Sequence, residues 1–344
     1  MFKALLATGR ISNLPTVWSN VLVAFVIIFG LNPERKDLVT VTHTLDMWLP
    51  LLITCIAASL LYVGGCFLGD AIDAKFDEQH KPDRPIPSGV LSRKGVFTGA
   101  IAMLALGSVI PFIITHGLIP AEKRPDSWLH LLAIPLLVAA IVLYSWLHKK
   151  TPWYGLPLIG ACRFCLVVFG GAMAASCIYQ EASFIPNSGW APLSEMLNGI
   201  LVTFAATVAA YTICFASVAR SESSPKPITW RKVLIPTMLI LPLWMLIPAM
   251  FESDFWEKLP QAAELLLYVD TFPIILVALA NYLIWNTCSF IKLKSNKGAF
   301  VSMSLAGFCL LDAFFIALSG WQNFFIVLGL FLLALLLQRW APAT

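Results

Sequence analysis

Residues 48–69, WLPLLITCIAASLLYVGGCFLG, form an apolar run that leads directly into the acidic segment DAIDAKFDEQH (70–80) and the loop KPDRPIPSG (81–89). About 20 mostly apolar residues are enough for a helix to cross the hydrocarbon core of a bilayer. This stretch therefore predicts a membrane-spanning helix whose charged end emerges at one face of the membrane.

The composition extends this prediction to the whole chain. Of its 344 residues, 59% are hydrophobic and 12% are charged, and the mean hydropathy is +0.81. Soluble proteins carry about 25% charged residues. The sequence therefore predicts an all-α integral membrane helical bundle with nine to ten transmembrane helices, forming a single domain over residues 1–344. The ten candidate spans are 14–31, 48–69, 96–116, 129–148, 154–176, 199–219, 232–251, 271–291, 299–319 and 322–339.

The start of the chain and its net charge add two expectations. No small-residue cleavage site follows the first apolar stretch, so we expect that stretch to remain as a membrane anchor. The net charge of +4 indicates no nucleic-acid partner.

Lysine and arginine are distributed unevenly between the two ends of the candidate spans. With ten spans and a cytoplasmic N-terminus, 17 of the 23 Lys and Arg residues fall on the cytoplasmic side and 5 on the other, while Arg163 lies within a span. Cytoplasmic loops of membrane proteins carry such an excess. The bias predicts that the N-terminus and the loop at 81–89 are cytoplasmic. Because no transit peptide is visible, a prokaryotic inner membrane is the expected location.

Three carboxylates follow the apolar run at helical spacing. Asp70, Asp73 and Asp77 are separated by three and four residues, so on a helix they share one face. Carboxylates this close repel one another unless a cation neutralises them. A hard divalent ion with oxygen ligands, Mg²⁺ above all, suits such a set, and its coordination is commonly completed by substrate phosphates. The alternative is a solvated helix end with interspersed charges.

The loop after the carboxylates carries cations on a stiff backbone. Lys81 and Arg84 precede the segment Pro85-Ile86-Pro87-Ser88-Gly89. Arginine can hold a phosphate through two parallel hydrogen bonds, and prolines lower the entropy that is lost on ordering a loop. The pattern indicates a phosphate-binding loop beside the acidic face.

The segment GDAIDAKFD followed by HKPDRPIPSG resembles the first aspartate-rich motif of the UbiA superfamily of membrane prenyltransferases. That motif reads N-D-x-x-D-x-x-x-D and is followed by an R-P-x-x-S-G loop. Gly69 stands where the family has asparagine, and the other motif positions match. The resemblance implies that Asp70, Asp73 and Asp77 hold Mg²⁺ and that, with Arg84, they act in catalysis.

Two other segments resemble the same family. GRISNLPTVW is similar to the entry of the family's first helix, which implies substrate-binding roles for Arg10 and Asn13. LYSWLHKK matches its Y-S-x-x-x-K signature, which implies that Tyr144 binds substrate and that Lys149 acts on the diphosphate. Without the family signature, a role for Lys149 as a positively charged anchor at the cytoplasmic membrane surface is equally consistent with the sequence.

The sequence departs from the family on the expected sixth helix. UbiA enzymes carry a second aspartate-rich motif there, but residues 211–232, YTICFASVARSESSPKPITWRK, contain no aspartate. The VARSES element is similar to a divergent UbiA-like branch, the EboC type. By that resemblance, Arg220 replaces the charge of a second metal ion, or Glu222 is its single protein ligand, or catalytic function has been lost or altered.

Polar residues inside the candidate spans are the remaining site candidates, because ionisable groups in a membrane are costly and usually have a partner or a task. Arg163 and Asp312 lie within two different spans and are predicted either to form a structural pair or to contact substrate. Asn13, Tyr144 and Tyr211 are expected to line a cavity.

Two functions follow from these patterns and the resemblance. The favoured one is Mg²⁺-dependent transfer of an isoprenyl group from a prenyl diphosphate donor to a lipid or aromatic acceptor within the bilayer. Lys81, Arg84, Lys149 and Arg220 would offset the phosphate charge. The alternative is a non-catalytic UbiA-like membrane carrier or lipid-binding protein that keeps the scaffold and one anion site.

Overall fold

The computed structural model describes residues 1–30, 44–113, 129–149, 152–181, 199–219, 231–246 and 272–341, and all their regular secondary structure is helical. The elements are α1 (Phe2–Thr8), η1 (Ile11–Asn13), α2 (Leu14–Gly30), α3 (Thr44–His80), α4 (Arg93–Ile113), α5 (Leu129–Leu147), α6 (Pro152–Glu181), α8 (Gly199–Ala219), α9 (Arg231–Ile240), η7 (Leu241–Leu246), α12 (Phe272–Ser295), α13 (Lys297–Ile316), η8 (Ala317–Ser319) and α14 (Trp321–Trp340).

The predicted membrane bundle is confirmed. Within the described ranges, eight helices are long and apolar enough to cross a membrane, and the shorter apolar helix Leu132–Leu147 joins them. The predicted run at 232–251 forms α9 and then the 3-10 helix η7, and its last five residues lie outside the described part. The two long stretches between candidate spans, 177–198 and 252–270, also lie largely or wholly outside it.

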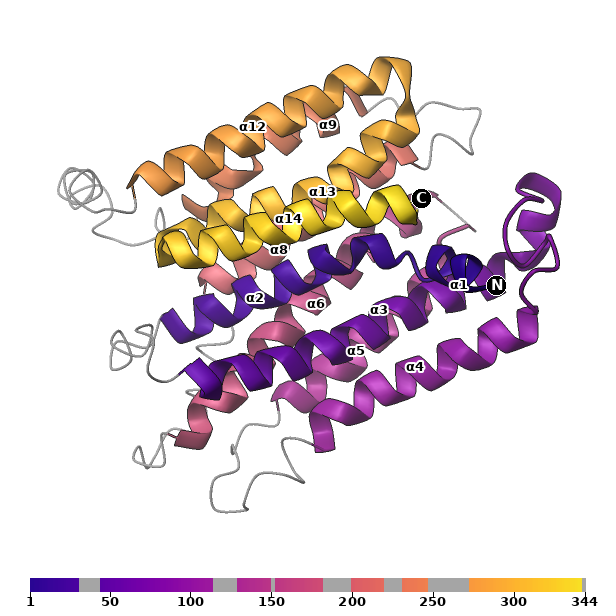
Figure 1. Cartoon of the computed structure of the whole chain (residues 1–344), viewed down its shortest axis with the longest axis horizontal. Coiled ribbons are helices and arrows are strands. Elements are labelled where there is room, and N and C mark those ends of the chain that lie inside the picture. The colour runs from indigo at the N-terminus through magenta and orange to yellow at the C-terminus, as the bar shows by residue number, and fades with distance from the viewer. Residues whose placement is uncertain are drawn as a thin grey trace.

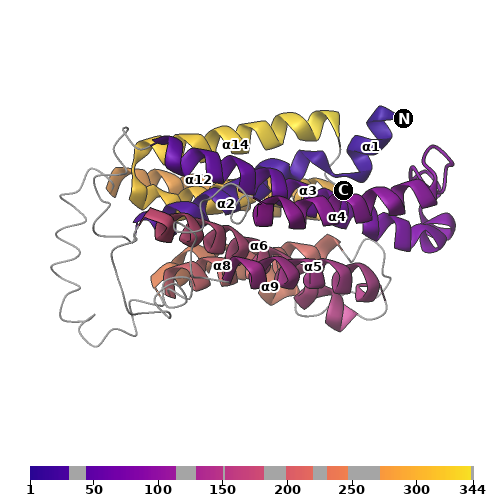
Figure 2. The same ribbon diagram turned by 90° about the horizontal axis from the view of Figure 1, so that it is seen from below.

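The long helices run side by side, and both chain ends lie at the same end of the bundle (Figure 1). In the view from below, α14 lies along one side and α5, α6 and α8 along the other (Figure 2). Most of α2 and α13 is buried within the bundle, whereas most apolar side chains of α4 and α14 are at least partly exposed. An outer helix can stay apolar where it faces lipid, because lipid tails are as apolar as leucine.

Local signals mark where α6, α13 and α14 begin. Pro152 opens α6, where a missing backbone N–H costs nothing. The Asn296 side chain caps α13 by accepting a hydrogen bond from the Ala299 backbone N–H at 3.0 Å. Gly320 has a φ of 103°, which only glycine adopts easily, and it connects η8 to α14 in a tight turn.

Glycine brings α3 and α4 into close contact. A Cβ atom added to Gly107 of α4 would lie 2.9 Å from Leu61 Cγ and 3.0 Å from the Ala57 carbonyl oxygen of α3. Backbone atoms cannot yield as a flexible side chain can. Small residues at such crossings let two membrane helices approach closely.

We expect Gly107→Val to destabilise the bundle by about 1–3 kcal/mol, the usual cost of overpacking a core. Gly99→Val on the same helix is the matched control, because a Cβ atom there meets nothing within 4 Å. The thermal unfolding midpoint of the purified protein in detergent measures both. Equal midpoints for the two variants would contradict the close α3–α4 contact.

Candidate active site

A cavity of about 610 Å³ opens among the helices at the end of the bundle where the two chain ends lie. It is lined by residues from the α1–η1 junction, α3, α5, α6, α8 and α13, together with the loop after α3. Its wall is apolar along α5 and α6, with Leu137 and Ile159 as examples, and also along α8 and α13. One charged region and one long apolar wall therefore share the same space.

The three carboxylates lie together at the charged region of this cavity. Asp70, Asp73 and Asp77 project from one face of α3, as their spacing predicts, and all three line the cavity. Their side chains are 14%, 11% and 3% exposed, respectively. Charges so poorly hydrated require partners.

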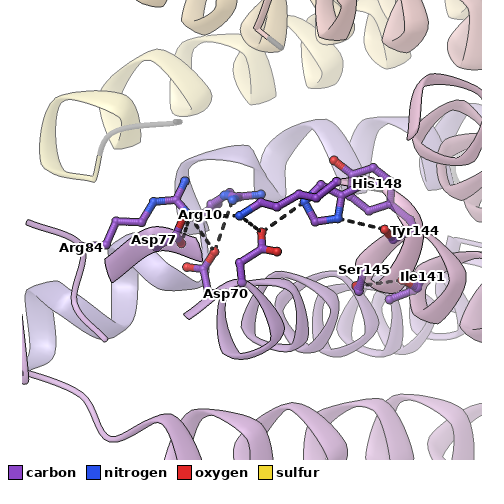
Figure 3. Close-up of polar contacts among 10 residues, drawn as sticks. Arg10, Asp70, Asp77, Arg84, Ile141, Tyr144, Ser145 and His148 are labelled. Carbon is purple, nitrogen blue, oxygen red and sulfur yellow. Dashed lines mark hydrogen bonds and ion pairs between the residues drawn. The ribbon is translucent and has the colours of Figure 1, made fainter. Parts of the chain in front are cut away.

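Arginines from two other segments supply part of that partnership (Figure 3). Arg84 of the loop approaches Asp77 at 2.7 Å and Asp70 at 3.5 Å, and Arg10 approaches Asp70 at 3.5 Å. Arg10 has a φ of 45°, a left-handed conformation that is rare outside glycine. Strain of this kind persists where the surrounding structure requires it, and here it accompanies a bend that brings the guanidinium to Asp70.

Lys149 and His148, just beyond the C-terminal end of α5, meet the same carboxylates. The Lys149 Nζ atom lies 2.9 Å from Asp73 Oδ2 and 3.4 Å from Asp77 Oδ1, and 3.9 Å from the centre of the Phe76 ring. The His148 Nε2 atom lies 3.1 Å from Asp73 Oδ2 (Figure 3). His148 is not among the site residues that the sequence predicts, because a histidine before two lysines resembles ordinary cytoplasmic anchoring.

The loop after α3 is ordered by its own backbone. Ser88 N–H donates to the Arg84 carbonyl at 2.9 Å, and Leu91 N–H donates to the Pro85 carbonyl at 2.9 Å. Gly89 adopts a φ of 76°, which a side chain would strain. These turns hold Arg84 over the carboxylates, while Lys81 of the same loop also lines the cavity.

The cavity continues to a polar group deeper in the bundle. Arg163 of α6 lines it and is only 7% exposed. Asn13 donates from Nδ2 to the Tyr62 hydroxyl at 3.0 Å, and both residues line the cavity, as Tyr144 does. Gly69, which stands where the family has asparagine, lies beside the carboxylates in the cavity lining. A Cβ atom added to Gly69 would meet nothing within 4 Å, so there is open space at this position.

Two predicted site residues lie away from this cavity. Tyr211 is fully buried, and its hydroxyl donates to Asn286 Oδ1 at 3.1 Å or to the Ser304 carbonyl at 3.0 Å, so it bridges helices and does not line the cavity. Asp312 is also fully buried and does not line the cavity. The predicted Arg163–Asp312 pair is indirect, because Asn20 lies between the two side chains.

Arg220 and Glu222 lie outside the described residues. The described part of the same helix, α8, contributes Thr212, Phe215, Ala216 and Ala219 to the cavity. As far as the structure describes it, this helix therefore faces the cavity without a carboxylate.

Carboxylate oxygens are the ligands that a hard cation prefers, and the three aspartates lie together at one rim of the cavity. In this arrangement, however, each is engaged by basic side chains, and no group of three His, Cys, Asp or Glu side chains in the described ranges is gathered closely enough to hold a metal ion. A metal would therefore have to take over oxygens that Arg10, Arg84 and Lys149 now contact.

Comparisons with known proteins agree on one family. The model of the UbiA prenyltransferase family matches residues 38–303. A digeranylgeranylglyceryl phosphate synthase of Methanoregula boonei is 29% identical over 151 residues, which is 44% of each chain. The enzyme of that name from Thermococcus kodakarensis is 32% identical over 111 residues, 31% of this chain and 36% of the other. The matched stretches thus span less than half of these relatives.

A solved structure supports the fold over almost the whole length. It comes from a study of digeranylgeranylglyceryl phosphate synthase in membranes, and it superposes with a TM-score of 0.51 over 96% of this chain and 99% of that chain. The sequence identity is 16%. At this identity the likeness concerns the arrangement of helices.

Proposed function

Because the chain belongs to the UbiA prenyltransferase family, we propose that it transfers an isoprenyl group from a prenyl diphosphate to an acceptor inside the membrane. The observation that carries the proposal is that one cavity combines three carboxylates, Arg84 and Lys149 with an apolar wall. A prenyl diphosphate has the same division, with an anionic head and an apolar tail.

The charged residues have separable roles in this proposal. Asp70, Asp73 and Asp77 would hold Mg²⁺, which supplies positive charge to the departing diphosphate. Arg84 and Lys149 would turn from the carboxylates toward phosphate oxygens, and Arg10 and Lys81 would add charge at the same rim. As the C–O bond breaks, the electron pair leaves with the diphosphate, and these cations stabilise the developing charge.

The apolar wall would protect the allylic cation from water until the acceptor nucleophile forms the new bond and then loses its proton. The acceptor class is suggested by the relatives. Their name denotes a glyceryl phosphate that carries two geranylgeranyl groups, so geranylgeranyl diphosphate and geranylgeranylglyceryl phosphate are the first donor and acceptor to test. We propose that the charged rim faces the cytoplasm, as the lysine and arginine distribution indicates.

The non-catalytic carrier is the second candidate, and the absence of carboxylates on the described cavity face of α8 favours it. If the UbiA-type chemistry needs acidic groups on both sides of the cavity, the chain depends on Glu222 for the second side. The two candidates predict different outcomes in one assay.

The test measures release of diphosphate from geranylgeranyl diphosphate by purified protein in detergent, with geranylgeranylglyceryl phosphate present. We expect release with Mg²⁺ and a loss of at least about 100-fold after chelation, because metal and cations share the stabilisation of the leaving group. Glu222→Gln shows whether that residue serves the metal. Mg²⁺-dependent binding of geranylgeranyl diphosphate without release, with this acceptor and with an aromatic acid, would favour the carrier.

A further inference from the structure

Arg163 is held at the inner part of the cavity by three hydrogen bonds to one face of α2. Its Nη1 atom donates to Asn20 Oδ1 at 3.0 Å and to the Thr16 carbonyl at 3.4 Å, and its Nη2 atom donates to Thr16 Oγ1 at 3.0 Å. The Phe308 ring centre lies 4.6 Å from the guanidinium carbon. A long flexible side chain is therefore fixed in one orientation.

Asp312 completes this arrangement from α13 without touching Arg163. It accepts hydrogen bonds from Asn20 Nδ2, at 3.0 Å to Oδ1 and 2.8 Å to Oδ2, and from the Ser19 hydroxyl. The amide of Asn20 is thereby oriented with its nitrogen toward Asp312 and its oxygen toward Arg163. Asn20 is a spacer between the two charges.

The spacer argues against a purely structural ion pair. An arginine buried for stability gains most from direct, bidentate contact with a carboxylate. In the described part of the chain, no carboxylate forms an ion pair with Arg163, although Asp312 lies one side chain away. The guanidinium lines the cavity with its positive charge offset only through an amide. Such a group is suited to an anionic ligand.

The position of Arg163 relative to the carboxylates indicates which ligand this is. Its guanidinium lies 5.8 Å from the Tyr62 ring centre, and Tyr62 precedes Asp70 by eight residues on α3. At about 1.5 Å per residue, the backbone of Tyr62 lies about 12 Å along α3 from that of Asp70. Arg163 therefore lies farther into the cavity than the acidic face of α3, where a second substrate that meets the donor can reach it.

We propose that Arg163, positioned by Asn20 and Asp312, binds an anionic group of the acceptor, so that the acceptor carries a carboxylate or a phosphate. This inference rests on the proposed transfer function and narrows it to anionic acceptors. Arg163 is the residue in contact with the ligand. Asn20 is a positioning residue, because it prevents Asp312 from neutralising the guanidinium.

The experiment measures binding of two matched ligand pairs to the purified protein in detergent, without turnover. One pair is geranylgeranylglyceryl phosphate and geranylgeranylglycerol, and the other is 4-hydroxybenzoate and 4-hydroxybenzamide. We expect the native protein to bind the charged member of one pair at least about 10-fold more tightly, in line with hydrogen bonds to a charged group. The pair that shows the preference distinguishes phosphate from carboxylate.

Two variants test the residues. Arg163→Gln should remove the preference to within about 2-fold, since it removes the charge. Asn20→Ala should do the same with an unchanged or higher unfolding midpoint, because Arg163 can then pair directly with Asp312. A merely structural role for Asn20 predicts the opposite, a lower midpoint with the preference intact.

If Arg163→Gln fails to fold, Thr16→Ala tests the same subsite, because it removes one hydrogen bond to the guanidinium. Thr207→Ala is its control, because it loses only a hydrogen bond within its own helix.

The outcomes separate this inference from the proposed function. Equal binding of both members of both pairs, no binding of either pair, or a preference that survives Arg163→Gln would overturn the anionic subsite. An Arg163-dependent preference in a protein that releases no diphosphate would support the subsite and count against the transferase. Binding of a geranylgeranyl thiodiphosphate, which resists cleavage, should be the same in Arg163→Gln and the native protein.

Discussion

Replacement of Asp73 by asparagine is expected to lower the rate of diphosphate release by about 10³-fold, because an electrostatic group at a developing charge commonly contributes 10²–10³-fold and a metal ligand adds to this. Asp73 is the carboxylate that meets both Lys149, at 2.9 Å, and His148, at 3.1 Å. Asparagine keeps the shape of the side chain, so the loss would report the charge. The measurement is release from geranylgeranyl diphosphate with Mg²⁺ present.

Glu78→Gln is the matched control for this variant. Glu78 lies on the same helix as Asp73, is exposed and does not line the cavity, so its neutralisation should change the rate less than about 2-fold, as surface charges usually do. Equal rates for Asp73→Asn and the native protein would exclude the acidic face of α3 from the chemistry.

Replacement of Lys149 by glutamine is expected to lower kcat/KM for the donor by about 10²-fold, since a charged hydrogen-bond donor to phosphate contributes about 1.5–3 kcal/mol and Lys149 also offsets two carboxylates. The ammonium bridges Asp73 and Asp77 and lies over the Phe76 ring. Without it, neighbouring carboxylates face each other with less neutralisation, and the diphosphate loses a cation. Lys149→Arg should retain part of the activity.

Lys94→Gln serves as the control, because Lys94 is an exposed cation at the start of α4 and does not line the cavity. If Lys149 were only a membrane-surface anchor, the two glutamine variants would reduce protein yield in the membrane to a similar extent and leave kcat/KM unchanged. A selective effect of Lys149→Gln on donor kinetics separates the two roles.

The acidic face and the membrane spans could be predicted from the sequence for local physical reasons. Helical periodicity brings residues separated by three and four positions onto one face, and Asp70, Asp73 and Asp77 do share one. Hydropathy identified the spans because a backbone in lipid must satisfy its own hydrogen bonds, which a helix does. Glycine at positions 89 and 320 takes positive φ values that other residues avoid.

The partners of those carboxylates could not be derived from local pattern. Arg10 lies 60 positions before Asp70 in the chain, and Lys149 lies 76 positions after Asp73. Resemblance to a family pointed to Arg10 and Lys149, but periodicity contains no information about contacts between distant helices. For the same reason, periodicity shows neither the contact between His148 and Asp73 nor that Tyr211 bridges helices away from the cavity, where the sequence predicts it.

The amino-acid sequence alone determined that this chain is a bundle of membrane helices with one acidic helix face and a basic loop beside it, because hydropathy and helical spacing act within a single segment. Tertiary packing decided which charges meet, namely Arg10, Arg84 and Lys149 at the carboxylates and Asn20 between Arg163 and Asp312. Those contacts depend on which helix faces lie against each other, and that depends on the close fit of side chains across the whole bundle.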